Sequence, residues 1–365
     1  MRSTLLPDEI RRMMVPKLAR EFYGPSSGVF IGSEGYPSVN AGALGMLAEQ
    51  PEPSSMLNMS YGDILSVRAA VIRSARKENI FSKERLVGDM QQIALAALPT
   101  DVEMIFFRKP TFSMNFDKIL QPMGLSAKLE KLRITENPKI DGKVEKIASD
   151  DIKASEASSL LYASGVDVYK ITTILSSGAL GMKKKLVPTR WSITAIDDII
   201  TKSLLKDVRG YKSVSEFMVF ESLNLDNRFV ALLMPGSWEF ENFESWPSGP
   251  WAGMEVEYEP FSGRTSYADK QAGGYYASRL GIVEHLQKIK RQARVVVFRE
   301  IYEGYSVPLG VWQVRENVRN AMRQEPRKFS DMKSALAHVS TRLKWPMQMY
   351  MNKSSLLKQK RLNDF

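Results

Sequence analysis

Apolar residues recur along this chain with two different spacings. In some stretches they return every three or four residues, which is the spacing of one face of an α-helix. This pattern predicts helices over residues 7–22, 82–98, 155–176, 192–206, 275–290, 311–324 and 331–344. Ser60 and Asp63 also form a capping box that predicts the start of a further helix. The apolar positions of that helix are Ile64, Val67, Val71 and Ile72.

Other stretches are continuously apolar and short, or alternate between apolar and polar residues, as strands do. They cover residues 29–31, 102–107, 228–234 and 295–298. Residues 238–241 alternate in the manner of a half-exposed strand, with aromatic rings inward and carboxylates outward. Strands separated by helices predict a mixed α/β (α+β) architecture whose sheet topology stays unassigned.

Two segments lack either spacing. Residues 135–157 are polar and poor in aromatic side chains, so we expect a solvated connector there. The helical spacing also fails from Pro346 onward. We therefore expect residues 346–365 to form a flexible tail until a partner binds it.

Charge is unevenly distributed along the chain. The 365 residues include 51 Lys and Arg against 41 Asp and Glu, which gives a net charge of +10. Residues 281–365 hold 17 basic and 7 acidic residues, so the whole excess lies in the last quarter. This polarity favours a phosphate-rich partner such as DNA, since neutralised phosphates release counterions. The alternative is a basic surface that only maintains solubility.

Several classes of chemistry are excluded by composition. The chain has no cysteine and two histidines, His285 and His338. Disulfides, thiolate nucleophiles, iron–sulfur clusters and Cys- or His-rich metal sites are therefore ruled out, and no metal site is predicted. No apolar run approaches the roughly 18 residues that cross a bilayer, and the N-terminus lacks secretory features. We expect a cytoplasmic, nucleoid-associated protein without a membrane partner.

A glycine-rich stretch, residues 24–45, is the first candidate for a nucleotide site. It contains Gly32 and Gly35 but neither of the common phosphate-loop patterns. Backbone amides beside these glycines could still approach a nucleotide or phosphate. Tight turns around a buried strand are the alternative interpretation.

Residues 183–198 combine a lysine run, an aromatic residue and two carboxylates. Arg190 could bind a phosphate while Trp191 stacks on a base. Asp197 and Asp198 are adjacent and would point about 100° apart on a helix, so they form a poor metal pair by themselves. We expect them on the exposed first turns of the helix, together with Thr194, where they favour its positive end.

Residues 239–259 hold six glutamates and no Lys or Arg. They could supply acid/base groups or bind Mg²⁺, and the half-exposed strand is the alternative. A further charged set is more typical of internal ion pairs than of catalysis. Its members are Arg279, Glu284, Arg291, Arg294, Arg299 and Glu300. We expect His285 to be structural.

The last seven residues fit the pattern Q-x-x-h-x-x-a, the peptide that sliding clamps such as PCNA bind. Leu362 and Phe365 lie three residues apart, so one helical turn presents both to an apolar pocket. Gln359 can enter a polar niche beside them. A frayed basic end is the alternative, since such a match occurs by chance.

Five long segments carry a resemblance to the archaeal Nre proteins, a DNA-repair family. They are GVFIGSEGYPSVNAG (28–42), QQIALAALPTDVEMIFFRKP (91–110), LVPTRWSITAIDD (186–198), GGYYASRLGIVEHL (273–286) and RQARVVVFREIYEGYSVPLGVWQVRE (291–316). The resemblance implies a clamp-binding C-terminus, which Gln359, Leu362 and Phe365 reproduce. It also implies an N-terminal Nre-type region (1–265), a basic C-terminal Nre-type region (266–345) and a tail (346–365). Many relatives begin with a cysteine-rich, zinc-binding segment, which this cysteine-free chain does not match.

The resulting hypothesis is a DNA-repair factor that residues 359–365 recruit to PCNA and that contacts DNA with basic residues after 281. The first alternative is an enzyme that processes nucleotides or nucleic acids. Its pocket would contain Gly32 and Gly35 of the 28–42 loop, Arg190, Trp191 and a carboxylate, Asp197 or Glu241. A nucleotide or Mg²⁺ would be its cofactor. A scaffold that binds the clamp without touching DNA is the second alternative. No catalytic residue is assigned.

Overall fold

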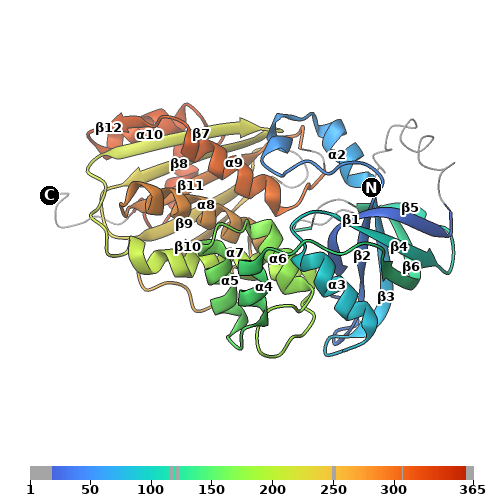
Figure 1. Ribbon diagram of the computed structural model, residues 1–365. Coiled ribbons are helices and arrows are strands. Elements are labelled where there is room, and N and C mark those ends of the chain that lie inside the picture. Colours follow the sequence, from blue (N-terminus) through green and yellow to red (C-terminus); the bar gives the residue numbers. More distant parts are fainter. Residues whose placement is uncertain (1–18, 116–118, 121–122, 249–251, 306, 359–365) are drawn as a thin grey trace. The chain divides into compact units, whose positions relative to one another are not determined.

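The computed structural model describes residues 19–115, 119–120, 123–248, 252–305 and 307–358. The described residues contain twelve strands and ten α-helices, which confirms the mixed α/β class (Figure 1). The chain divides into two compact units, Met1–Ile200 and Thr201–Phe365. In the described ranges, no helix is long and apolar enough to cross a membrane.

The first unit is built around one closed sheet. Its strands are β1 (Glu21–Ile31), β2 (Ser38–Met46), β3 (Val71–Asn79), β4 (Thr100–Phe106), β5 (Thr111–Asn115) and β6 (Met123–Ile134). The strand order is β3-β2-β1-β4-β6-β5, and β3 also pairs with β6 in parallel. This extra pairing closes β1, β2, β3, β6 and β4 into a barrel with β5 attached to β6.

Most of the barrel interior is apolar, although Glu78, opposite Val39, is also buried and pairs with Arg76. On β2, Val39, Ala41 and Ala43 are fully buried, and on β4 every second residue is buried. The helix α3 (Arg85–Leu95) packs Met90 and Ile93 into the same core. It corresponds to the helix predicted over 82–98.

The remaining helices of this unit differ from the predicted ones in two places. These helices are α2 (Tyr61–Ala69), α4 (Gly142–Ser149), α5 (Ala154–Ala163), α6 (Val168–Ser176) and the start of α7 (Thr189–Val208), with the 3-10 turn η2 (Ser55–Asn58). The unit boundary at Ile200 falls within α7. Ser60 caps α2 by accepting from the Asp63 amide, as predicted, but the helix ends at Ala69 and Val71 and Ile72 belong to β3. The expected connector over 135–157 is wrong because α4 and the start of α5 lie there.

The predicted helix over 155–176 is in fact two helices. Gly165 separates α5 from α6 and has φ +90°, a left-handed conformation that interrupts a right-handed helix. Asp167 then caps α6 by accepting from the Tyr169 amide. Of the helix predicted over 7–22, residues 7–18 lie outside the described part, and Glu21 and Phe22 belong to β1.

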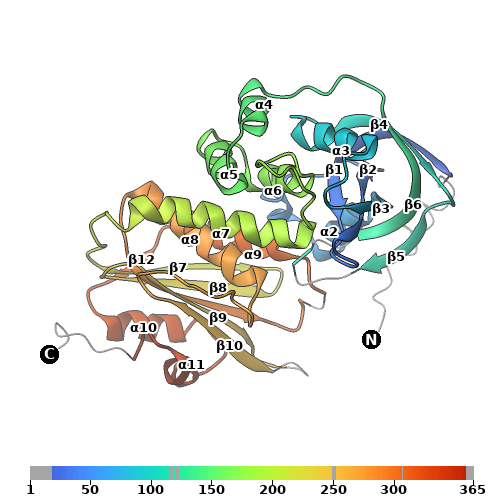
Figure 2. The ribbon, with the colours of Figure 1, turned by 90° about the horizontal axis from the view of Figure 1, so that it is seen from below.

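The second unit is an open six-stranded sheet. Its strands are β7 (Phe217–Asn224), β8 (Asn227–Met234), β9 (Glu239–Trp246), β10 (Gly253–Glu259), β11 (Arg294–Ile301) and β12 (Arg327–Phe329). Their order is β10-β9-β11-β8-β7-β12, and only the β9–β11 pair among them is parallel. The helices α8 (Gly273–Ile289) and α9 (Val311–Arg323) cover one face, and α10 (Met332–Ser340) and α11 (Met347–Lys353) lie on the other (Figure 2).

The segment after Pro346 is folded up to the last described residue, contrary to the expected flexible tail. Pro346 precedes α11, and the Tyr350, Leu356 and Leu357 side chains are buried against the sheet beside Phe243. The helical spacing of apolar residues fails there because the seven-residue helix α11 and the turns after it bury these residues. The clamp-like motif, residues 359–365, lies outside the described residues.

Candidate nucleic-acid interface

Two of the predicted site residues, Arg190 and Trp191, lie beside the turn between β1 and β2. Trp191, on the first turn of α7, contacts Tyr36 with ring centroids 5.0 Å apart and planes tilted by 52°. Both rings are nearly half exposed, 43% for Tyr36 and 45% for Trp191. The Thr189 hydroxyl accepts from the Ile31 amide at 3.0 Å, which fixes the start of α7 beside this turn. Arg190 lies next to Trp191 with an exposed side chain.

Gly32 and Gly35 shape the same turn. The Gly32 amide donates to the Asn40 carbonyl at 2.7 Å, so this N–H is already bonded and does not face a phosphate. Gly35 has φ +79°, which glycine adopts without strain, and its carbonyl accepts from the Ser38 amide at 2.9 Å. These bonds suit a tight turn that presents Tyr36 to solvent.

The carboxylates of α7 lie differently from the prediction. Asp197 is fully buried and Thr194 nearly so, which corrects the expectation that both lie on exposed turns. Across the described part of the chain, no group of three or more Asp, Glu or His side chains is placed to hold a metal ion.

The glutamates of residues 239–259 also differ from the prediction. Glu241, Glu244, Glu257 and Glu259 are buried rather than outward-facing on a half-exposed strand. Helices cover both faces of this sheet (Figure 2), so side chains on either face are shielded from solvent. The expectation failed because the cations that neutralise these carboxylates come from elements that lie later in the chain.

The deepest of these pairs joins β10 to α8. Arg279 and Glu259 form an ion pair whose side chains are each 1% exposed. Glu259 also accepts from the Tyr275 hydroxyl at 2.9 Å and from the Trp238 ring N–H at 3.2 Å. Burial and the neighbouring carboxylate raise the pKa of Tyr275, so this phenol stays protonated. With its acceptors occupied by protein donors, Glu259 is a structural group.

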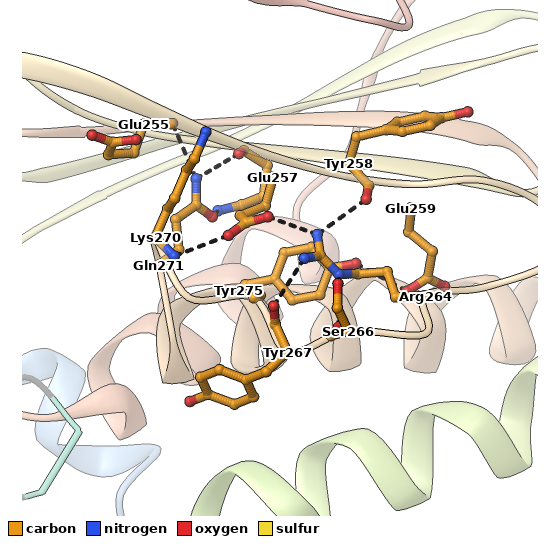
Figure 3. Close-up of polar contacts among 12 residues, drawn as sticks. Glu255, Glu257, Tyr258, Glu259, Arg264, Ser266, Tyr267, Lys270, Gln271 and Tyr275 are labelled. Carbon is orange, nitrogen blue, oxygen red and sulfur yellow. Dashed lines mark hydrogen bonds and ion pairs between the residues drawn. The ribbon is translucent and has the colours of Figure 1, made fainter.

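A second pair organises the loop between β10 and α8 (Figure 3). Arg264 donates to Glu257 at 2.7 Å and to the carbonyls of Tyr258 and Tyr267 at 3.1 and 3.2 Å. The Lys270 amide donates to the other Glu257 oxygen at 3.0 Å. The loop is thus fixed by one buried carboxylate and one guanidinium.

Other predicted charges are paired inside the same unit. Arg299 bonds Glu244 at 2.7 Å and the Asn227 side chain, and Arg319 bonds Glu284 at 2.6 Å. These pairs, with Arg294 on Glu239, agree with the expectation of internal pairing for most of the charged set, whereas Arg291 is exposed. His285 is packed against Phe220, and burial lowers its pKa, which agrees with a structural role.

Two carboxylates hold the C-terminal segment to the sheet. Glu241 accepts from the Ser354 hydroxyl and, at 2.6 Å, from the Ser355 amide. Glu300 accepts from the Trp345 amide at 2.8 Å and from the Tyr350 hydroxyl at 2.8 Å. The chain is therefore fixed as far as Leu357, two residues before Gln359.

Exposed cations gather where α8 ends and β11 begins. We define this basic end by Lys212, Lys288, Lys290 and Arg291, whose side chains are all exposed. The Gln292 side chain connects the segment after α8 to the segment after α7, because it donates to the carbonyls of Arg209 and Tyr211 at 3.2 and 2.6 Å. Cations at the C-terminus of a helix are also favoured by its dipole.

The basic end includes an aromatic side chain that the sequence analysis missed. Phe261, which follows β10, is 46% exposed, and the Arg209 guanidinium lies over its ring at 5.5 Å. Tyr36 was missed in the same way. In the sequence, Tyr36 is an aromatic residue inside a glycine turn, and Phe261 directly follows a strand. This signal is weak because the sequence does not show which side chains lie beside either ring.

A cavity of about 530 Å³ in the first unit is a poor anion site. It lies beside the N-termini of α4 and α6, but Asp141 and Asp167 already accept from the amides there. Lys170 also lines it, and burial lowers the pKa of this amine to about 8. Its ammonium donates to the Ala96 carbonyl at the C-terminal end of α3, which is a structural cap.

Two models of the same protein family together match nearly the whole chain. The family model described as Archaeal Nre, N-terminal, matches residues 8–252, and Archaeal Nre, C-terminal, matches residues 259–365. The DNA repair protein NreA of Archaeoglobus fulgidus is 37% identical over 329 residues, 86% of this chain and 83% of that protein. The DNA repair protein NreB of the same organism is 36% identical over 94% of this chain and 90% of its own length.

A third relative, the DNA repair protein NreA of Haloferax volcanii, is 36% identical over 83% of this chain and 78% of its own length. No solved structure matches the chain. The two family models meet near residues 252–259, whereas the compact units meet at Ile200.

Proposed function

The chain belongs to the archaeal Nre family, and from this membership we propose that it is a DNA-repair protein associated with the chromosome. The observation that carries the proposal is the match of both family models, together with three relatives named as DNA-repair proteins at 36–37% identity. Two finer proposals concern its partners, the sliding clamp and DNA.

We propose that residues 359–365 bind PCNA. The support is the sequence Q-x-x-L-x-x-F, in which Leu362 and Phe365 are spaced as two apolar anchors and Gln359 fixes the register. Burying two such side chains contributes roughly 3–6 kcal/mol gross, and ordering the peptide subtracts a few kcal/mol. A micromolar affinity is therefore expected.

Isothermal titration of the full chain with PCNA tests this proposal. Leu362→Ala/Phe365→Ala should reduce the affinity at least 30-fold, as should removal of residues 359–365. Asn363→Ala, between the anchors, is the matched control and should bind as the unmodified chain does. Full affinity in the truncated protein would refute the proposal.

We propose that the basic end contacts the DNA backbone. Lys212, Lys288, Lys290 and Arg291 are four exposed cations, and the Gln292 amide donates to the Lys212 carbonyl at 3.1 Å, so their two backbone segments are adjacent. Exposed acidic side chains nearby, Asp207 and Glu216, are fewer. Each phosphate contact should add about 0.9 to the slope of log affinity against log salt concentration.

Fluorescence anisotropy with a labelled 25-base-pair duplex at 50–300 mM salt tests the contact. Lys290→Ala/Arg291→Ala should weaken binding and reduce the salt slope by about 2. Lys83→Ala/Lys139→Ala, which removes two exposed cations of the first unit, is the control and should leave the slope unchanged. An unaltered slope in the first variant would show that DNA does not touch the basic end.

A second candidate function is a nucleotide-processing activity around Gly32, Gly35, Arg190 and Trp191. The exposed Trp191 ring beside the glycine turn favours it, whereas the bonded Gly32 amide does not. A nucleotide that occupies such a pocket raises the melting temperature by mass action. No rise with millimolar ATP and Mg²⁺ would remove this candidate.

A further inference from the structure

The barrel of the first unit has a specific strand order. Going round the barrel, β1 pairs with β2, β2 with β3, β3 with β6, β6 with β4, and β4 with β1. All pairs are antiparallel except β3 with β6. Leaving β5 aside as an addition, this is the order 1-2-3-5-4-1 of the five-stranded Greek-key barrel called the OB-fold.

Three details agree with that topology. The helix α3 lies between the third and fourth barrel strands and packs into the barrel core. β1 is shared, pairing with β4 through residues 21–26 and with β2 through residues 26–31. Its register shifts between Ser26 and Val29, the bulge by which one long strand bends to serve both neighbours.

OB-folds bind oligonucleotides or oligosaccharides on the face of strands 2 and 3 and on the loop between strands 1 and 2. In this chain the loop is residues 32–37, which contains Tyr36. Fold by itself does not assign a function, so the side chains at this position must decide.

The outer face of β2 and β3 carries cations and amides. Asn40 is directly opposite Lys77, and Leu44 is opposite Arg73, so these pairs share one face. Lys77 is exposed and its ammonium donates to the Ser38 carbonyl at 3.3 Å. The Arg73 guanidinium lies over the Phe30 ring at 5.0 Å. This surface is suited to a negatively charged, planar ligand.

The aromatic pair extends this face at its loop end. Tyr36 and Trp191 contact each other yet keep 43% and 45% of their surface exposed. A pair whose only role was to attach the loop to α7 would gain more by burying both rings. Arg190 stands beside Trp191, and the one carboxylate on the loop is Glu34.

We infer that the β2–β3 face, with Tyr36 and Trp191 at its edge, binds single-stranded DNA by stacking unpaired bases on the exposed rings. Lys77, Arg73 and Arg190 accompany the backbone phosphates. This inference rests on the proposed repair function, and it adds the substrate class: DNA with unpaired bases, bound at a different surface from the basic end. A neutral oligosaccharide carries no phosphate whose charge these side chains could neutralise.

Anisotropy with labelled dT₂₀ and with a 25-base-pair duplex, using the full chain, tests the inference. Base stacking on one aromatic side chain is worth about 1–3 kcal/mol, which corresponds to a 5- to 150-fold affinity change. Trp191→Ala and Tyr36→Ala should each weaken dT₂₀ binding within that range. Tyr36→Phe keeps the ring and should bind dT₂₀ nearly as well as the unmodified chain.

Tyr23→Ala is the matched control, because Tyr23 is an aromatic residue of the same barrel that is 72% exposed. It should leave dT₂₀ binding unchanged, and melting curves of all variants establish that the barrel stays folded. Unaltered dT₂₀ affinity in both Trp191→Ala and Tyr36→Ala would overturn the inference. Displacement of dT₂₀ by a neutral oligosaccharide at equal concentration would also overturn it.

The two DNA proposals can fail separately. Trp191→Ala should leave duplex affinity and its salt slope intact, whereas Lys290→Ala/Arg291→Ala should weaken duplex binding. Equal loss of duplex and dT₂₀ binding in Trp191→Ala would mean that the rings do not distinguish unpaired bases, which contradicts the inference while sparing the basic-end proposal.

Discussion

The two sheets of this protein are stabilised by different means. The barrel of the first unit encloses an apolar core in which Val39, Met90 and Phe106 are fully buried. The open sheet of the second unit buries charges, among them Arg279, Glu259 and Glu300. A closed barrel gives each strand one inward and one outward face, whereas helices cover both faces of the open sheet.

This difference determines which substitutions each sheet tolerates. An apolar core loses stability in proportion to the contacts removed. A buried ion pair contributes little net stability, but breaking it leaves one charge without its partner, which is costly. The second unit should therefore be the more sensitive to single polar substitutions and the more tolerant of matched double ones.

The largest effect is expected at the Arg279–Glu259 pair. Arg279→Met leaves the Glu259 carboxylate buried without its cation and should lower the unfolding free energy by about 3–5 kcal/mol. Urea denaturation monitored by circular dichroism measures the loss. Arg279→Met/Glu259→Gln removes both charges and should recover much of the stability; no recovery would mean that packing, and not charge, sets the cost.

A smaller effect is expected in the barrel. Met90→Ala deletes a fully buried side chain from α3 and should cost about 2–4 kcal/mol through lost contacts and the cavity left behind. Because no charge is involved, this cost should be the same in 0.05 and 1 M NaCl. A strongly salt-dependent cost would break the contrast between the two sheets.

The sequence predicted some strands of each sheet: β4 and the end of β1 in the barrel, and β8, β11 and the start of β9 in the open sheet. Val102 to Phe107 is a short apolar stretch interrupted only by Glu103, so this strand was predicted within two residues of its bounds. On β9 the alternation of apolar and polar residues misled, because Glu241 and Glu244 are buried and bonded to other parts of the protein rather than to water. Their donors, Ser354 and Arg299, lie 113 and 55 residues away, and local patterns carry no information about them.

The candidate site was predictable in part. Trp191 was named from its basic and aromatic surroundings, and the structure adds Tyr36 as its neighbour. The barrel strand order that makes the loop between β1 and β2 a candidate binding site depends on the parallel pairing of β3 with β6, about fifty residues apart. A helix and two further strands lie between them, so no local signal predicts that pairing.

A pH-dependent effect is expected at Glu241. Burial raises the pKa of this carboxyl above its ordinary value of 4.5. The folded state then binds the proton more tightly than the unfolded chain, so the contribution of Glu241 is fully present below pH 4.5 and is lost as pH rises through the folded pKa. The stability advantage of the unmodified chain over Glu241→Gln should therefore shrink from pH 4 to pH 8. Parallel stability curves would contradict the shift.

The smallest effect is expected at the end of the chain. Leu356 and Leu357 are buried against the second sheet, and Glu241 holds Ser354 and Ser355, so the chain is anchored as far as Leu357. Removing residues 359–365 should change the melting temperature by no more than about 2 °C, since surface changes usually alter stability by at most about 0.5 kcal/mol. Removing residues 346–365 instead should lower it by many degrees, because α11 and both leucines are lost from the core. Equal melting temperatures for the two truncations would show that α11 adds nothing to the sheet, and a large drop for the shorter one would mean that residues 359–365 pack on the protein before any clamp binds them.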